Sequence, residues 1–129
     1  MKSSLIISLT AIVLLFSAFS APPAWVRLGS RLVNYGLDRD VIQVNRVREA
    51  FTALRIQVRR GGINLHRLEV VFENGERQEI EVRHQFRAGS ESRQVDLNGN
   101  RRNIDKIIFW YDTKNIARGK AVITVLARR

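Results

Sequence analysis

The feature that most constrains the fold is an alternation of apolar and polar residues, which runs through nearly every segment after Trp25. Leu54, Ile56 and Val58, for example, are separated by polar residues. Successive side chains of a strand point to opposite faces, so this pattern is typical of antiparallel strands with one buried and one solvated face. No segment shows the period of an amphipathic helix. The chain is therefore predicted to be all-β, with helix content close to nil.

Turn sequences separate the predicted strands at intervals of about ten residues. Asn-Gly, the strongest short hairpin signal, occurs at Asn74-Gly75 and Asn98-Gly99, and further turns are expected at Gly61-Gly62 and Ala88-Gly89-Ser90. The predicted strands are 26–33, 41–45, 52–59, 63–66, 68–73, 78–86, 92–97, 104–112 and 120–127. About eight or nine short antiparallel strands of this spacing predict a single β-sandwich, with a jelly-roll arrangement as one variant.

The N-terminus has the three parts of a secretory signal peptide. Lys2 precedes a largely apolar run at 5–16, and small residues follow it. Cleavage is expected after Ser20, which divides the chain into a signal peptide (1–20), a short tether (21–25) and a sandwich domain (26–129). The alternative is an uncleaved membrane anchor, although a spanning helix needs about 20 apolar residues. The sequence thus predicts an exported protein, periplasmic or extracellular, with no transmembrane span after cleavage.

Composition limits both the stabilising interactions and the partners of this domain. The chain has no cysteine, so packing and sheet hydrogen bonds must stabilise it, and thiolate metal sites are excluded. Its formal net charge is +10, and most of the cations are arginine, whose guanidinium group matches phosphate and carboxylate in a bidentate way. An anionic partner is one hypothesis, and a solvated surface without a specific site is the other.

The segment from Arg93 to Tyr111 resembles a known family. Its residues are Arg93-Gln94-Val95-Asp96-Leu97-Asn98-Gly99, followed by Arg102, Ile104, Ile107, Phe109 and Tyr111. They are similar to the pattern R-x-[IV]-D-L-x-G-x-x-R-x-I-x-x-I-x-F-x-Y of small exported bacterial proteins of unknown function. Leu28-Gly29-Ser30-Arg31 and Asp38-Arg39-Asp40 are also similar to that group. The resemblance implies an arginine-rich exported β-sandwich, supplies no catalytic residues and leaves the function open.

Residues that could catalyse a reaction or bind a metal are few. Of the two histidines, His66 is expected in a surface turn and His84 at the edge of the core. No known ligand spacing links them. An enzyme would need one of them beside an aspartate in a concave pocket. We therefore expect no enzyme, no catalytic residues, no metal and no cofactor, and a small hydrolase is kept as an alternative.

Basic side chains and a few aromatic rings are the remaining candidates for function. Arg55, Arg59 and Arg83 form a positive sheet face if their strands are neighbours. Strand 104–112 is apolar on both sides, so Ile108 and Trp110 are either covered or form an exposed contact patch. The leading hypothesis is a non-catalytic binding module for an anionic envelope component, such as an acidic glycan or a lipid headgroup, or for a protein partner. The candidate contact residues are Arg55, Arg59, Arg83, Arg102 and Trp110.

Other functions remain open. A carbohydrate-binding module could stack Trp25, Trp110 or Tyr111 on a sugar, although adjacent residues 110 and 111 point to opposite faces of a strand. A homodimer through the face of Ile108 and Trp110 is a structural alternative. Nucleic acid is disfavoured, because export is expected and the interleaved aromatics of stacking platforms are missing.

Overall fold

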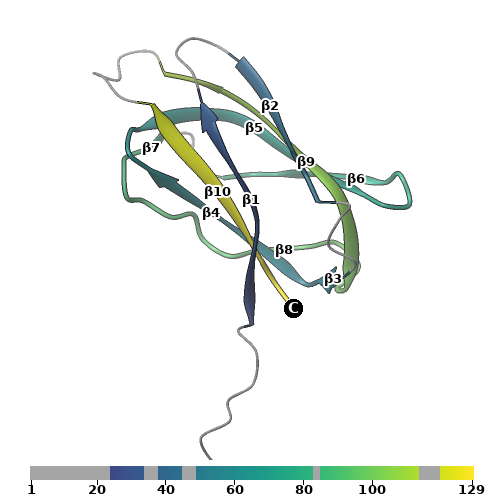
Figure 1. Ribbon diagram of the computed structural model, residues 1–129. Coiled ribbons are helices and arrows are strands. Elements are labelled where there is room, and N and C mark those ends of the chain that lie inside the picture. Colours follow the sequence, from purple (N-terminus) through teal and green to yellow (C-terminus); the bar gives the residue numbers. More distant parts are fainter. Residues whose placement is uncertain (1–23, 34–37, 45–48, 83–84, 114–119) are drawn as a thin grey trace, which may run out of the picture.

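The computed structural model describes residues 24–33, 38–44, 49–82, 85–113 and 120–129. Within these ranges the chain is all-β, and two antiparallel sheets pack face to face (Figure 1). This confirms the predicted β-sandwich. The predicted signal peptide and most of the tether lie outside the described residues, as do Arg83 and His84.

Strands that follow one another along the chain often belong to different sheets. The strands are β1 (Trp25–Val33), β2 (Asp38–Gln43), β3 (Ala50–Phe51), β4 (Ala53–Arg59), β5 (Ile63–Phe72), β6 (Arg77–Ile80), β7 (Gln85–Phe86), β8 (Val95–Asp96), β9 (Arg102–Asp112) and β10 (Ala121–Arg128). The four-stranded sheet has the order β1-β10-β4-β8, and the six-stranded sheet has the order β2-β9-β5-β6, with β3 paired to β9 and β7 to β5. The chain therefore changes sheets between β1 and β2, β3 and β4, β4 and β5, β7 and β8, β8 and β9, and β9 and β10.

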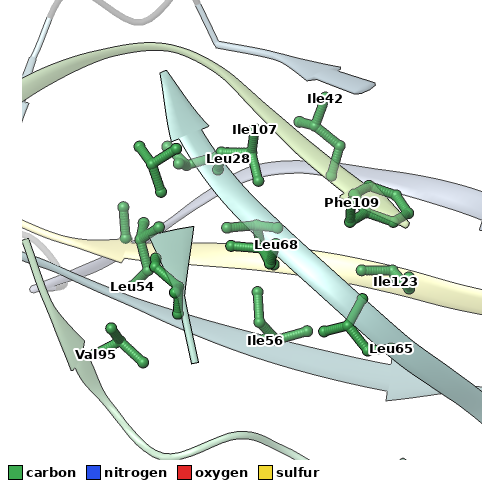
Figure 2. Close-up of a cluster of buried hydrophobic side chains, with 14 of the residues drawn as sticks. Leu28, Ile42, Leu54, Ile56, Leu65, Leu68, Val95, Ile107, Phe109 and Ile123 are labelled. Atoms are coloured by element: carbon green, nitrogen blue, oxygen red, sulfur yellow. The ribbon is translucent and has the colours of Figure 1, made fainter. Parts of the chain in front are cut away.

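The core lies between the sheets, where every second side chain points inward (Figure 2). Ile56 of β4 and Ile123 of β10 meet Leu68 of β5 and Phe109 of β9 in this layer. Phe109 and Leu68 have no exposed surface at all. Because apolar burial is the main favourable contribution to folding, this layer provides the stability that disulfides give to many small exported domains.

One open side of the sandwich is closed where β1 passes β2. A Cβ atom added to Gly29 would lie 2.7 Å from Cγ2 of Ile42, well inside the carbon–carbon contact distance of about 3.5 Å. Nearby, Nε of Arg31 donates a hydrogen bond of 2.9 Å to the carbonyl oxygen of Val41. Glycine is therefore required at position 29 because the two sheets approach each other closely there.

The variant Gly29→Ala is expected to lower the free energy of unfolding by about 1–2 kcal/mol, because the new methyl group overpacks against Ile42. Ile42→Ala alone is expected to lower it by about 2–5 kcal/mol by leaving a cavity. Urea unfolding of both variants and of the double variant measures their coupling. The double variant should lose less than the sum of the two single losses, and simple additivity would show that the methyl group does not meet Ile42.

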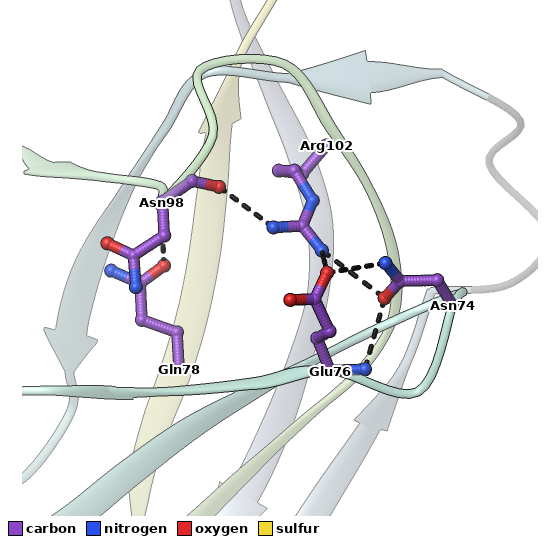
Figure 3. Close-up of polar contacts among 5 residues, drawn as sticks. All are labelled: Asn74, Glu76, Gln78, Asn98 and Arg102. Carbon is purple, nitrogen blue, oxygen red and sulfur yellow. Dashed lines mark hydrogen bonds and ion pairs between the residues drawn. The ribbon is translucent and has the colours of Figure 1, made fainter.

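A network of polar side chains closes the opposite side, and we call it the polar clasp (Figure 3). Its members are Asn74, Glu76, Gln78, Asn98 and Arg102. Nε2 of Gln78 donates to the carbonyl oxygen of Asp96 (3.1 Å), and its Oε1 accepts from the backbone N–H of Asn98 (2.8 Å). The side chain of Gln78 thus links β6 to β8 and to the turn that follows β8.

Some strand boundaries differ from the prediction. Residues 63–66 and 68–73, predicted as two strands, form the single strand β5, whose register shifts between Leu65 and Arg67. The predicted strand 78–86 is replaced by β6 and β7. Asn74-Gly75 joins β5 to β6 in a hairpin as predicted, with a φ of 90° at Gly75. Asn98-Gly99 also turns, but it connects strands of different sheets.

Candidate functional site

Arginine side chains gather on the outer face of the four-stranded sheet. Arg55 and Arg59 point outward from β4 because Leu54, Ile56 and Val58 take its inward positions. In the β-ladder, Leu126 of β10 lies between Arg55 and Arg27 of β1. Arg128, two residues after Leu126, shares its face and is exposed. We call Arg27, Arg55, Arg59 and Arg128 the arginine face.

The arginine face is poorly neutralised. Among the described residues, the acidic side chain that contacts it is Glu91, whose Oε1 lies 3.7 Å from Nε of Arg55 and also accepts a hydrogen bond from Gln57. The buried Nε of Arg55 makes no hydrogen bond, and its guanidinium group lies 4.4 Å from the ring centre of Trp25. Arg27 donates to the hydroxyl of Ser30 (2.8 and 3.1 Å). Asp96 of β8 adds a second carboxylate, because the ladder places it beside Ala53 on the same face. Four guanidinium groups against two carboxylates leave this face positive.

The structure does not bring together all the residues proposed from the sequence. β4 pairs with β10 and β8, whereas β6 and β7, which flank residue 83 in the sequence, pair with β5 in the other sheet. The condition for a face shared with Arg83, that β4 neighbours the predicted strand 78–86, is therefore not met by β6 and β7. Arg83 itself lies outside the described residues, so of the three predicted members Arg55 and Arg59 define the face.

Arg102 lies in the polar clasp rather than on the arginine face. Its Nη1 donates to the carbonyl oxygen of Asn98 (3.0 Å), and its Nη2 donates to Glu76 (2.7 Å) and Asn74 (3.2 Å). Its guanidinium carbon lies 3.8 Å from the ring centre of Phe72. The hydrogen bond from Asn74 and the charge of Arg102 hold the pKa of Glu76 below its ordinary value. These contacts give Arg102 a structural role.

Trp110 lies on the outer face of the six-stranded sheet, where it is half-buried. The guanidinium carbons of Arg67 on β5 and Arg39 on β2 lie 4.7 and 5.6 Å from its ring centre. Ile108 is only 2% exposed, because β9 is a central strand with neighbours on both sides. Of the two predicted alternatives, the covered one is therefore correct for Ile108, and the exposed contact patch is wrong for it. Tyr111 is fully buried and donates its hydroxyl to Asp40 (2.9 Å), so it cannot stack on a sugar.

Opposite charges pair on this six-stranded face. The buried carboxylate of Glu69 accepts hydrogen bonds from Arg77 (2.6 Å) and Arg67 (2.5 Å). These bonds, that of Arg77 foremost, hold the pKa of Glu69 below its ordinary value. Glu79 lies 3.5 Å from Nε of Arg67. Among the described residues, two arginines of this face are thus held in ion pairs with acidic side chains, whereas on the arginine face Arg55 alone has such a contact.

A histidine–aspartate pair on the six-stranded sheet was missed by the sequence analysis. His66 lies in β5 at the register shift, not in a turn, and hydrogen-bonds through Nε2 to the buried carboxylate of Asp112 on β9. Asn64 donates to the same carboxylate (2.8 Å). His66 also lines a cavity of about 380 Å³, whose other lining residues are Leu65, Arg67, Glu79, Ile80, Glu81 and Val82. Among the described residues, this lining contains no serine, threonine or cysteine that could act as a nucleophile.

The comparisons with known proteins identify a family. A family model described as a domain of unknown function, DUF2541, matches residues 6–127. The chain belongs to this family. No curated protein shows significant similarity to it. Among solved structures, it is similar to the SPBc2 prophage-derived protein YomS, with 13% identity and a TM-score of 0.38 over 77% of this chain and 100% of that one. A likeness of this size carries no argument about function.

Two further properties bear on this DUF2541 domain. In the described ranges, no helix has the length and apolar character that crossing a membrane requires. The same ranges hold no group of three or more histidine, cysteine, aspartate or glutamate side chains that could bind a metal ion. The arginine face and the His66 cavity are the two surface features that we take as candidate sites.

Proposed function

We propose that this domain is an exported, non-catalytic binding module whose arginine face holds an anionic component of the cell envelope. The observation that carries the proposal is the difference in ion pairing between the outer faces of the two sheets, as seen in the described residues. On the six-stranded sheet, Glu69 and Glu79 pair with the neighbouring arginines. On the four-stranded sheet, Glu91 contacts Arg55 alone, and the other three guanidinium groups have no acidic contact among the described residues. A surface with unpaired charge of one sign attracts ligands of the opposite sign.

The spacing of the cations favours a ligand with repeated charges. Arg55 and Arg59 are four residues apart on one strand, which corresponds to about 13 Å, and Arg55 and Arg27 are separated by one strand, about 10 Å. An anion that pairs with all four guanidinium groups at once must therefore present several charged groups. A polyanion such as an acidic glycan, or an array of headgroups, presents several anionic groups over such distances.

A small hydrolase is supported by one observation, the His66–Asp112 pair beside a cavity. A histidine oriented by a buried aspartate is the arrangement of a general base. The part of the lining that the structure describes supplies no hydroxyl or thiol nucleophile, so the base would have to activate water. A binding function of the arginine face needs no such additional assumption. The proposal therefore rests on that face and not on the histidine–aspartate pair.

Retention on a heparin column in a salt gradient tests the proposal. The protein is expected to elute well above roughly 0.3 M salt, where isolated exposed charges are strongly screened. Arg59→Glu should lower the elution salt concentration clearly more than Arg101→Glu, which makes the same charge change at an exposed residue of the turn before β9. Equal shifts in the two variants would mean that heparin senses only the net charge, and the proposal would be wrong.

A further inference from the structure

We infer that the ligand of the arginine face is the surface of a bilayer that contains anionic phospholipids, with Leu32 and Trp25 entering its interfacial region. The inference rests on the proposed function, because it assigns a ligand to the same face. It adds apolar contacts to the charge interactions, and a soluble polyanion would not need such contacts in order to bind.

Leu32 provides the first apolar contact. It is the large apolar side chain that remains exposed among the described residues, at 46% of its surface. The β-ladder places it beside Val122 of β10, and Val122 in turn beside Arg59 of β4. Val122 is half-buried. An apolar pair thus lies directly next to a guanidinium group at one end of the arginine face.

Trp25 provides the second apolar contact, at the other end of the same face. It pairs with Arg128 across the ladder, and the guanidinium group of Arg55 lies 4.4 Å from its ring centre. Its indole is partly exposed. Tryptophan is suited to the boundary between headgroups and acyl chains, because its ring is apolar and its N–H group can still meet a polar partner.

The combination of these groups distinguishes a bilayer from other anionic ligands. An acidic glycan would pair with the guanidinium groups but would leave Leu32 in water. A bilayer surface presents phosphate groups to the arginines and an apolar layer just beneath them for the leucine and the indole. The positive charge and the exposed apolar side chains of this one face therefore both favour an anionic bilayer surface as the ligand.

Sedimentation with lipid vesicles tests the inference. We expect the exported protein to bind vesicles of phosphatidylcholine and phosphatidylglycerol and to remain free with phosphatidylcholine alone. Arg59→Glu should lower the affinity at least about fivefold, the effect of one arginine near an anionic membrane. Leu32→Ser should lower the affinity for the mixed vesicles by about tenfold and leave elution from heparin unchanged.

A matched control is Val41→Ser, which changes a half-buried apolar residue on the edge strand of the other sheet and should leave vesicle binding unchanged. Circular dichroism of each variant checks that it folds. Equal binding to both vesicle types, or full binding by Leu32→Ser, would overturn the inference. If heparin elution depends on Arg59 but mixed vesicles are not bound, the bilayer is wrong and the proposed function stands. If Arg59→Glu changes neither measurement, both are wrong.

Discussion

Phe109→Ala is expected to lower the free energy of unfolding by about 3–5 kcal/mol, a large part of the total of about 5–15 kcal/mol for a domain of this size. Phe109 is fully buried on β9, which has partners on both sides in the six-stranded sheet, as β5 has. Its ring lies 5.8 Å from that of Tyr111. Removing the ring leaves a cavity between the sheets. Urea unfolding followed by circular dichroism measures the loss.

The matched control for Phe109→Ala is Leu32→Ala. Because almost half of this side chain is exposed, its truncation should change the unfolding free energy by no more than about 0.5 kcal/mol. If Phe109→Ala is too unstable to purify, Phe109→Leu should still show a loss of about 1–2 kcal/mol. Equal small losses for both positions would contradict the assignment of the core to the layer between the sheets.

Arg102→Ala is expected to lower the free energy of unfolding by about 2–3 kcal/mol. The side chain is only 16% exposed and makes hydrogen bonds to Asn98, Glu76 and Asn74, so its removal breaks the polar clasp. Hydrogen bonds of charged groups contribute about 1.5–3 kcal/mol each, and the loss is limited because the carboxylate of Glu76 can return to water. Urea unfolding again gives the measurement.

Arg101→Ala is the matched control, since it removes the adjacent, exposed arginine. It should change the stability by about 0.5 kcal/mol or less. Both variants should show the same small change in elution from heparin. A stable Arg102→Ala variant with a large drop in heparin elution would instead restore Arg102 as a ligand residue and contradict its structural role.

The alternation of the sequence predicted the fold class but failed where a register shift intervenes. In β5, Leu65 and Leu68 both point into the core although they are three residues apart. A bulge inserts one residue and reverses the phase of the alternation. Read with a strict period of two, the segment therefore divides into strands 63–66 and 68–73, and His66, at the end of the first, is expected in the turn. Tertiary pairing with β9 is what shows that the strand continues.

The sequence could not show which strands share a sheet. Asn98-Gly99 has the residues of a hairpin turn, yet the strands on either side of it pair with different partners. Arg27 and Arg128 were not singled out because they join Arg55 only through the pairing of β1, β10 and β4. Likewise, His66 and Asp112 are distant in sequence and meet through the pairing of β5 and β9. Side-chain neighbours of this kind depend on sheet order, which local patterns do not encode.

The central claim is that the anionic ligand binds the outer face of the four-stranded sheet. The most direct test is a titration of the isotopically labelled protein with a heparin-derived oligosaccharide, followed by amide chemical shifts in nuclear magnetic resonance spectra. The account predicts shifts that cluster on β1, β4 and β10 around Arg27, Arg55 and Arg59. Shifts that cluster instead around His66 and Trp110 on the six-stranded sheet would contradict it.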